Sequence, residues 1–467
     1  MSIIFDTNKS FEYSIPVIVV GSGGCGLSAA LAVKETGADV LVIERDPTPL
    51  GTTAMSTGLI PGANTRFQRE AQIDDSPDLF KKDILNKTKG QTNEEIALNL
   101  AEESAETVEW LVDNHQVPLS LVDTFLYPGH SVMRMHGTPN RTGSELMGSL
   151  CIAAERSQVD ILTNALVTDL FSDDDKCILG VKVLMADGEI QEIGCDALIL
   201  ACCGFAGNSE MVEEYMPEIK EAEFFGHPGN KGDAIRWGKS LGAAMADISS
   251  YQGHGGLAAG RGVPILWPMI MEGAYQINEQ GLRFSDESKG YSEQAVEVVK
   301  QPNKVAWNIF DERLHKLMLE FEDYHNAIEA NAIIRSDSVE ELSEITGIEH
   351  LRLKQTIMDV EDMVDGKKED DFGRIFTEKP KLSPPYFAVK VTGALFHTQG
   401  GLVVDKNARV LDEEGNQLPN LYAGGGSARG ISGPADWGYM AGNGLLTATT
   451  FGRLAGKSAA ALIKKMK

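Results

Sequence analysis

An apolar run that breaks into three spaced glycines constrains the fold of this chain more than any other feature. Residues Val17 to Val20 are typical of a buried parallel strand, and Gly-x-Gly-x-x-Gly follows directly, with glycines at 21, 23 and 26. An Ala-rich stretch of helical character, Leu27 to Thr36, comes next. A second apolar strand, Val40 to Ile43, ends in Glu44. This order of strand, turn, helix and strand predicts a βαβ unit of the Rossmann type.

Each glycine of the motif has its own physical task. Gly21 makes the tight turn, Gly23 lets the backbone approach a pyrophosphate, and Gly26 lets the helix pack closely on the strand. The helix that follows offers N–H groups and the positive end of its dipole to phosphates. Glu44, 23 positions after Gly21, can accept hydrogen bonds from a ribose. A glycine triplet alone also arises from packing, but the full combination indicates a dinucleotide site.

Two further segments indicate which dinucleotide is bound. A small, hydroxyl-rich loop, Gly51 to Gly58, follows Glu44, and glycine-rich strand and helix segments lie at 420–426 and 442–446. This arrangement resembles the FAD domain of two-dinucleotide-binding-fold flavoproteins. More narrowly, it resembles the fumarate reductase/succinate dehydrogenase flavoprotein superfamily, which includes the 3-ketosteroid dehydrogenases. The resemblance implies FAD. In succinate dehydrogenases a histidine of this loop carries a covalent flavin, and residues 51–58 contain none, so we expect non-covalent binding.

The resemblance also implies a fold class and a domain organisation. We expect an α/β protein with a Rossmann-like FAD-binding domain at 1–250 and 387–467 and an inserted α+β catalytic or cap domain at 251–386. The residues that it implies for cofactor binding are Gly21, Gly23, Gly24, Gly26, Glu44, Arg45, Thr52, Thr53, Ser56, Gly58, Val167, Gly204, Gly425, Gly426, Asn443, Leu445 and Leu446.

Charge and apolar content exclude other classes of protein. The 467 residues carry a formal net charge of −26, which argues against binding nucleic acid or an anionic membrane surface. No apolar run approaches the ~20 residues of a membrane span, and we expect no integral membrane segment. Residues 1–14 are polar and acidic, unlike a signal peptide.

Cysteine spacing bears on metals and on the route of the electrons. The six cysteines show no paired spacing for zinc or iron–sulfur ligands, so we expect no metal and a cytoplasmic protein with reduced thiols. The chain also has no Cys-x-x-Cys-His haem-attachment motif. Electrons would therefore pass to an external acceptor, which is oxygen, a quinone or a carrier protein.

The window from 278 to 291 contains the candidate base. In fumarate reductases a Gly-x-Arg-Phe-x-x-Glu core is followed by the arginine that donates the proton, but here the two ways of counting reach Gly290 and Tyr291. The 3-ketosteroid dehydrogenases have Arg-Phe-x-Asn-Glu-Ser-x-Pro-Tyr, whose tyrosine takes the α-proton. This chain has Arg-Phe-Ser-Asp-Glu-Ser-Lys-Gly-Tyr from Arg283, so the resemblance implies that Tyr291 is the base. The alternative is a tyrosine that only packs beneath the cap.

A second departure from the fumarate reductases lies near the C-terminus. Those enzymes have a substrate-binding arginine three residues before a Gly-Asn pair, and here that position is Tyr439. Ketosteroid dehydrogenases bind the ketone oxygen with a tyrosine and a glycine N–H. The resemblance implies this role for Tyr439 and Gly442, with a spacing that differs by one residue. A further tyrosine supports the base in those enzymes, and Tyr127, in Leu-Tyr-Pro-Gly, is the candidate here.

Two histidines occupy positions typical of fumarate reductases. His397 lies in His-Thr-Gln-Gly-Gly, which resembles the His-Thr-x-Gly-Gly of that family, and His254 ends a Gln-x-His pattern. In the family these histidines bind substrate carboxylates, whereas a lone histidine is more often structural. Three arginines are further candidates for holding a carboxylate: Arg134, Arg141 and Arg429.

Tyrosines placed for ketone chemistry and histidines placed for a carboxylate together suit a small cyclic oxo acid. The resemblance then implies a flavin-dependent desaturase that introduces an α,β double bond into a cyclic ketone such as 4-oxocyclohexanecarboxylate. Tyr291 would remove the α-proton, and the β-hydride would pass to FAD. Three alternatives stay open: a 3-ketosteroid dehydrogenase, an enoate reductase of the fumarate or urocanate type, and a non-catalytic FAD-binding subunit.

Overall fold

The computed structural model describes residues 1–466, which divide into two compact units. Unit 1 comprises residues 1–215, 226–251 and the segment from 397 onward, and unit 2 comprises residues 216–225 and 252–396. The limits of the FAD-binding and cap domains given above stay predictions. Within the described part of the chain, no helix combines the length and the apolar character that a membrane crossing requires.

A nine-stranded sheet forms the centre of unit 1. Its strands are β1 (Ser2–Phe5), β2 (Tyr13–Val20), β3 (Val40–Ile43), β7 (Asp160–Leu162), β8 (Ala165–Ser172), β9 (Ile178–Met185), β10 (Ile190–Leu200), β19 (Arg409–Leu411) and β20 (Gln417–Ala423). Their order is β1-β8-β9-β10-β2-β3-β7, with β20 beside β10 and β19 beside β20. The pairs of β2 with β10 and β3, of β3 with β7 and of β10 with β20 are parallel. Short strands make two further small sheets: β4 (Ile60–Pro61), β5 (Ser120–Leu121) and β6 (Met135–Gly137) form one, and β12 (Met245–Ala246) and β18 (Gly401–Leu402) the other.

The described part of unit 1 also contains helices. They are α1 (Gly24–Lys34), α2 (Gly51–Ala54), α3 (Arg66–Glu70), α4 (Pro77–Lys87), α5 (Glu94–Asp113), α6 (Gly143–Arg156), α7 (Ser209–Tyr215), α8 (Asp233–Ser240) and α15 (Asn443–Met466). The α/β prediction is confirmed, since β2, α1 and β3 form the expected βαβ unit. The strand residues Val17, Ile18 and Val19 are fully buried, which explains their continuous apolar sequence.

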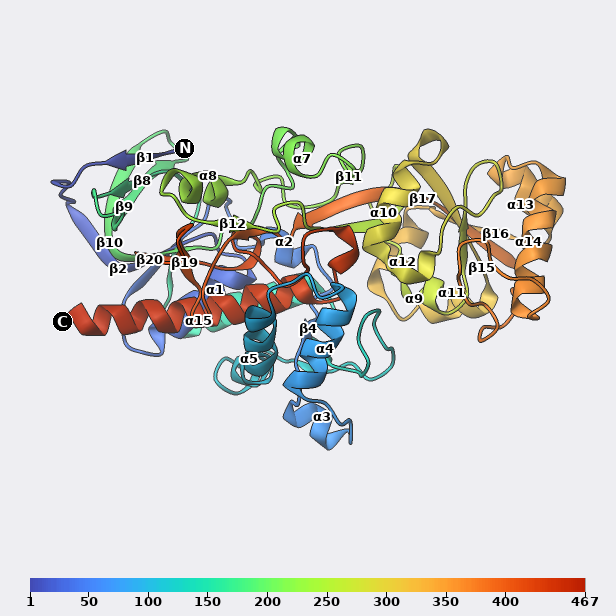
Figure 1. The fold of residues 1–467 in the computed structure, drawn as a ribbon, viewed down its shortest axis with the longest axis horizontal. Helices are drawn as coiled ribbons and strands as arrows, with labels where there is room; N and C mark the ends of the chain where they lie inside the picture. The colour runs from blue at the N-terminus through green and yellow to red at the C-terminus, as the bar shows by residue number, and fades with distance from the viewer. Residues whose placement is uncertain (467) are drawn as a thin grey trace. The chain divides into compact units, whose positions relative to one another are not determined.

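The first and last helices of unit 1 lie side by side (Figure 1). Two glycines of α15 make this close approach feasible. A Cβ on Gly452 would lie 2.3 Å from the carbonyl oxygen of Cys25, and a Cβ on Gly456 would lie 2.3 Å from that of Ala29. Backbone therefore packs against backbone here, and the C-terminal helix completes the fold around the N-terminal strand–turn–helix.

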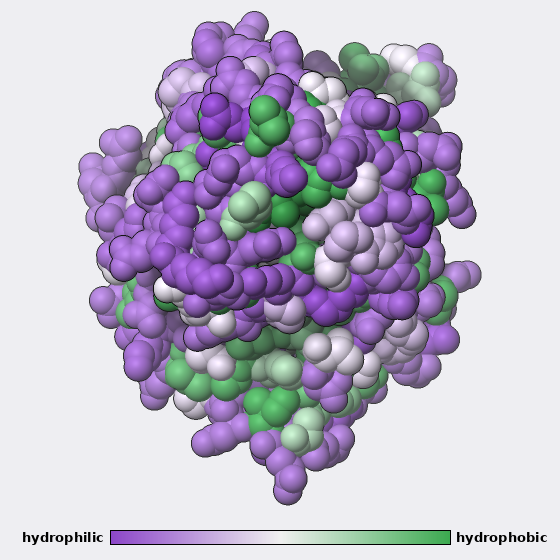
Figure 2. Space-filling view, turned by 90° about the vertical axis from the view of Figure 1, so that its right-hand side faces the viewer, coloured by the Kyte–Doolittle hydropathy of each residue, from purple (hydrophilic) through white to green (hydrophobic). Residues whose placement is uncertain are grey.

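Unit 2 is built on one long strand, β17 (Tyr386–Thr398), which pairs with four others. The remaining strands are β11 (Glu223–Phe224), β13 (Tyr251–Ala258), β14 (Tyr275–Ile277), β15 (Val305–Asp311) and β16 (Ile333–Ser336). Its helices are α9 (Pro268–Met271), α10 (Tyr291–Val299), α11 (Glu312–Met318), α12 (Glu322–Glu329), α13 (Val339–Thr346) and α14 (His350–Val364). The face that Figure 2 shows is hydrophilic over most of its area, with apolar residues in smaller groups, as suits a strongly acidic chain.

Candidate active site

A pocket in unit 1 opens where the parallel strands β2, β3, β10 and β20 end, so it lies at the carboxyl edge of the sheet. Ten of the predicted cofactor residues line it: Gly21, Gly23, Gly24, Glu44, Arg45, Thr52, Thr53, Val167, Gly425 and Gly426. The other seven are not among its lining residues, and their cofactor role stays a prediction: Gly26, Ser56, Gly58, Gly204, Asn443, Leu445 and Leu446.

The glycine turn has the backbone geometry that its sequence predicts. Gly21 has φ of 100°, and a Cβ there would lie 2.6 Å from the carbonyl oxygen of Ala201. A Cβ on Gly26 would lie 1.8 Å from the carbonyl oxygen of Gly21, so the helix can approach the turn only without a side chain. Gly23 is the N-cap of α1 and supplies no side-chain cap. The N–H of Gly24 donates to the hydroxyl of Thr53 at 3.0 Å, so an anion would interact with the other N–H groups in the first turn of α1.

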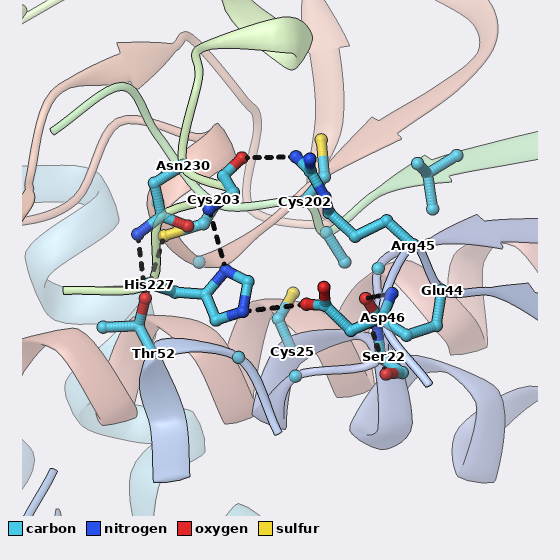
Figure 3. A pocket seen from close by; sticks show the side chains of 18 of the residues that line it. Ser22, Cys25, Glu44, Arg45, Asp46, Thr52, Cys202, Cys203, His227 and Asn230 are labelled. Carbon is cyan, nitrogen blue, oxygen red and sulfur yellow. Dashed lines mark hydrogen bonds and ion pairs between the residues drawn. The ribbon is translucent and has the colours of Figure 1, made fainter. Parts of the chain in front are cut away.

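Glu44 is held rigidly at the end of β3 (Figure 3). Its Oε2 accepts hydrogen bonds from the backbone N–H and the hydroxyl of Ser22, at 2.9 Å and 2.6 Å, and its Oε1 accepts from the N–H of Asp46 at 3.0 Å. These bonds satisfy part of the carboxylate and leave lone pairs for a ribose diol. The arrangement supports the ribose role proposed for Glu44.

Sequence reasoning missed a loop that closes one side of this pocket. His227 lies 2.8 Å from Asp46 through Nε2 and Oδ2, and the carbonyl oxygen of Gly229 accepts a hydrogen bond from Arg45 at 3.1 Å. Asn230 donates to the hydroxyl of Thr52 at 2.8 Å. Figure 3 shows these side chains around the pocket. A loop rich in Gly, Pro and Asn before α8 was the available sequence signal, but its partners are about 180 positions away.

Two buried polar atoms of the pocket make no hydrogen bond within the described residues. They are Asp233 Oδ1, which lies 3.6 Å from the guanidinium of Arg236, and Trp237 Nε1, and both belong to lining residues. Burial raises the pKa of Asp233. Buried polar groups normally make hydrogen bonds, so an indole N–H and a carboxylate oxygen that make none indicate a polar ligand in this pocket. Together with the glycine turn and Glu44, these residues fit FAD.

His397 and Tyr439 lie together within unit 1. Their rings are 5.8 Å apart in an edge-on arrangement, and a Cβ on Gly444 would lie 3.0 Å from Nε2 of His397. The imidazole therefore faces the first turn of α15, directly after Asn443. Burial lowers the pKa of His397, so the ring is held neutral.

Tyr127 and Gly442 also belong to unit 1. Tyr127 packs on a small apolar cluster that contains Ala441, the neighbour of Gly442. Burial raises the pKa of Tyr127 to about 12, against the opposing influence of the Arg141 charge. Gly442 has φ of 81°, and its N–H donates no backbone hydrogen bond within residues 1–466. This N–H is available as a donor to a ligand.

The three candidate arginines occupy different environments. Arg134 is fully buried, and its guanidinium donates to Asp75 at 2.8 and 3.0 Å and to Asp83 at 2.7 Å. All three nitrogens of Arg134 are thus engaged by aspartates, and its substrate-binding role stays a prediction. The Nε of Arg429 donates to Asp247 at 2.6 Å, which leaves the outer edge of its guanidinium for a ligand. Arg141 and Arg429 stay candidates.

Tyr291 and His254 lie together within unit 2. Tyr291 is the first residue of α10, and its ring stacks on His254 with centroids 5.2 Å apart. The ring of His254 also stacks on Phe396, at 5.2 Å. Burial lowers the pKa of His254 to about 3, and its Nδ1 accepts the N–H of Gly256 at 3.1 Å. His254 is therefore neutral with its proton on Nε2, which makes that nitrogen a hydrogen-bond donor.

A buried ion-pair cluster precedes Tyr291 and was not anticipated. Glu287, only 1% exposed, bonds to Arg283 at 2.7 Å and to Arg374 at 3.1 Å. Its Oε1 also accepts the backbone N–H of Gln276 at 2.8 Å. The Arg and Glu of the Arg-Phe-x-x-Glu pattern thus fix the short turn at 287–289 that leads into α10. The cluster sets where Tyr291 begins its helix.

A parallel sheet with a glycine turn after β2, a carboxylate after β3 and a closing C-terminal strand and helix defines a flavoprotein of the dinucleotide-binding class. Comparison with known proteins agrees, since a family model described as an FAD binding domain matches residues 16–445. A probable fumarate reductase of Shewanella frigidimarina is 30% identical over 446 residues, which is 95% of this chain and 74% of that protein. The chain therefore belongs to the FAD binding domain family, within the fumarate reductase/succinate dehydrogenase flavoprotein superfamily, as an FAD-dependent oxidoreductase.

Three further proteins are similar to this chain. A urocanate reductase of Eggerthella lenta is 27% identical, covering 96% of this chain and 75% of that protein. The open conformation of a flavocytochrome c3 fumarate reductase superposes with a TM-score of 0.82 at 28% identity, covering 97% of this chain and 79% of that chain. A 3-ketosteroid Δ1-dehydrogenase from Sterolibacterium denitrificans superposes with a TM-score of 0.79 at 22% identity, covering 96% of this chain and 99% of that chain, which is a likeness of fold.

Proposed function

We propose that this protein is a flavin-dependent desaturase that introduces an α,β double bond into a small cyclic oxo acid such as 4-oxocyclohexanecarboxylate. The observation that carries the proposal is the start of α10, where a tyrosine stacked on a neutral histidine replaces the arginine expected of a fumarate reductase. A second tyrosine, Tyr439, replaces the other expected arginine and lies against His397. Phenol groups suit proton transfer and hydrogen bonding to a ketone better than charge neutralisation of a dicarboxylate.

Proton removal and enolate stabilisation are the tasks of this chain's own residues. In the proposal, the Tyr291 oxygen takes the proton from the carbon next to the ketone. The hydroxyl of Tyr439 and the N–H of Gly442 donate to the ketone oxygen and stabilise the negative charge that develops there. Bound FAD would supply the hydride acceptor. Tyr127, beside Ala441, is proposed to assist the base.

The carboxylate of the substrate is assigned to histidines and an arginine. His254 carries its proton on Nε2 and is neutral, so it contributes a hydrogen bond and no charge. His397 is proposed to act in the same way. The positive charge that balances the substrate carboxylate would come from Arg429 or Arg141, since the guanidinium of Arg134 is occupied by Asp75 and Asp83. The proposal also includes an external electron acceptor, which is oxygen, a quinone or a carrier protein, and a cytoplasmic location.

Anaerobic mixing of the FAD-loaded protein with 4-oxocyclohexanecarboxylate tests this function. We expect the flavin absorbance near ~450 nm to bleach, and a Tyr291→Phe variant to bleach at least about a hundredfold more slowly while it keeps its FAD, as loss of a general base predicts. A parallel mixture with a 3-ketosteroid separates the two ketone classes. Bleaching by the steroid alone would discard the carboxylate roles of His254 and His397.

A second candidate, an enoate reductase, is favoured by the names of the relatives, which include fumarate and urocanate reductases. Oxidation of a reduced dye in the presence of fumarate or urocanate measures it directly. If either acid is turned over and no ketone bleaches the flavin, the protein is an enoate reductase and the proposed desaturase reaction is wrong. The two missing arginines predict that fumarate is a poor substrate.

A further inference from the structure

One ring nitrogen of His397 has two neighbours of opposite character. Nδ1 lies 3.1 Å from the side-chain amide nitrogen of Gln399 and 3.2 Å from the carbonyl oxygen of Thr398. The amide N–H is a donor and the carbonyl an acceptor, so each suits a different tautomer of the ring. The partner that Nδ1 adopts decides whether Nε2 carries a proton.

A chain of buried side-chain hydrogen bonds fixes the orientation of Gln399. Asn443 Nδ2 lies 3.2 Å from the hydroxyl of Ser432, which donates to Gln399 Oε1 at 2.8 Å. Asn443, Ser432 and Gln399 are 0%, 1% and 5% exposed, so water does not substitute for these bonds. Because the Ser432 hydroxyl occupies Oε1, the N–H of the same amide is directed at His397.

We call the hydrogen-bonded chain from Asn443 through Ser432 to Gln399 the relay. The backbone around it is also held in place. The N–H of Gln399 donates to the carbonyl of Ser250 at 2.7 Å, and the N–H of Gly430 donates to the carbonyl of Gln399 at 2.8 Å. On the far side of the ring, Gly444 lacks the side chain that would lie 3.0 Å from Nε2. One edge of the imidazole is thus fixed by the relay, and at the other edge Gly444 places no side chain against Nε2.

We infer that Gln399 is a positioning residue that, with Ser432 and Asn443, holds His397 as the Nε2–H tautomer, so that Nε2 donates to an anionic oxygen of the substrate. The inference rests on the proposed function, because it specifies how His397 would bind a carboxylate. Burial keeps the imidazole neutral, so the ring can donate from only one nitrogen, and the tautomer matters. Gln399 occupies the variable third position of His-Thr-x-Gly-Gly, which ties the relay to this particular sequence.

Nitrogen-15 NMR of histidine-labelled, FAD-loaded protein tests the tautomer without substrate. The chain has nine histidines, and a His397→Asn variant identifies the signals of His397. We expect the wild type to show a protonated Nε2 and an unprotonated Nδ1. Gln399→Met removes the donor and leaves Thr398 as the partner of Nδ1, so the protonation pattern should invert. Gln399→Glu, similar in size, offers Nδ1 an acceptor and should invert it as well.

Kinetics give a second readout of the same inference. Gln399→Met should raise KM for the oxo acid about tenfold with kcat changed less than about twofold, because a ground-state hydrogen bond is lost. Gln280→Met, at an exposed glutamine, is the matched control and should change neither quantity.

The possible results separate the relay from the function. A wild-type Nδ1–H signal, or an unchanged pattern in both Gln399 variants, would overturn the inference whatever the enzyme's substrate. An inverted pattern in a protein that leaves ketones untouched would keep the relay and remove the proposed function. If Gln399→Met loses FAD, the Gln399→Glu variant decides the tautomer.

Discussion

Glu287 carries its carboxylate into the interior of unit 2, where charges are costly unless they are paired. Burial by itself would raise its pKa, but the charges of Arg374 and Arg283 outweigh that effect and hold the pKa of Glu287 below its usual range. The carboxylate is thus stable only as part of the cluster. The same contacts fix the turn that precedes Tyr291, which links a stability feature to the proposed base.

A Glu287→Gln substitution should lower the free energy of unfolding by about 3 to 5 kcal/mol at neutral pH, because it leaves the buried Arg374 without its carboxylate and Arg283 with Asp370 alone. Urea denaturation measures this change. Glu297→Gln, which removes an exposed pair with Lys300, is the control and should cost less than about 1 kcal/mol. Equal effects of the two substitutions would show that the buried cluster contributes nothing special.

The stability difference between wild type and Glu287→Gln depends on pH with a defined sign. The folded-state pKa of Glu287 is lowered, so its contribution to stability is present above the unfolded value of ~4.3 and is lost as the pH falls through the folded value. The gap between wild type and Glu287→Gln should therefore shrink in acid. A gap that stays constant down to about pH 3 would contradict the paired state of the carboxylate.

At the scale of elements, the contact of α1 with α15 depends on the absence of side chains. Gly456→Ala would place a methyl group 2.3 Å from the carbonyl oxygen of Ala29, and one helix must then move. We expect a loss of about 1 to 3 kcal/mol in stability and weaker FAD binding, since α1 begins at the phosphate turn. Fluorescence titration of the apoprotein with FAD checks the second effect.

An exposed helix position supplies the matched comparison for this substitution. Gly148 lies within α6, and a Cβ there meets no atom within 4 Å. Gly148→Ala should therefore stabilise the protein by about 0.5 to 1 kcal/mol, from helix propensity alone. If Gly456→Ala behaved like Gly148→Ala, the close approach of the two helices would be disproved.

At the scale of the whole molecule, binding of FAD to unit 1 should couple to folding. Acid precipitation should release the flavin into the supernatant, because residues 51–58 contain no histidine to hold it covalently. Free FAD at ~100 times its Kd should stabilise the apoprotein by about 2.7 kcal/mol. Flavin that stays with the precipitate would contradict non-covalent binding, and an unchanged melting temperature would contradict a preformed pocket.

Local sequence patterns made the centre of this fold predictable. Long-range pairings could not be predicted from such patterns. The strand, glycine turn, helix and Glu44 follow from periodicity and from glycine chemistry over about 30 residues. The pairing of His227 with Asp46 depends on segments brought together only by the folded chain. The ion pairs of Arg134 could not be predicted for the same reason, since its partners Asp75 and Asp83 lie 59 and 51 positions away.

The packing of α15 against α1 also has a consequence for biosynthesis. The strand β2 and the helix α1 are synthesised well before α15, which packs against α1 and begins only at Asn443. At about 5–20 residues per second, the nascent Rossmann segment waits roughly 20 to 80 seconds for its partner. During that interval the buried face of α1 is exposed in every growing chain. The FAD pocket, which includes Gly425 and Ala448, is therefore completed only after residue 443 has been made, and the exposed face of α1 is accessible to chaperones throughout the interval.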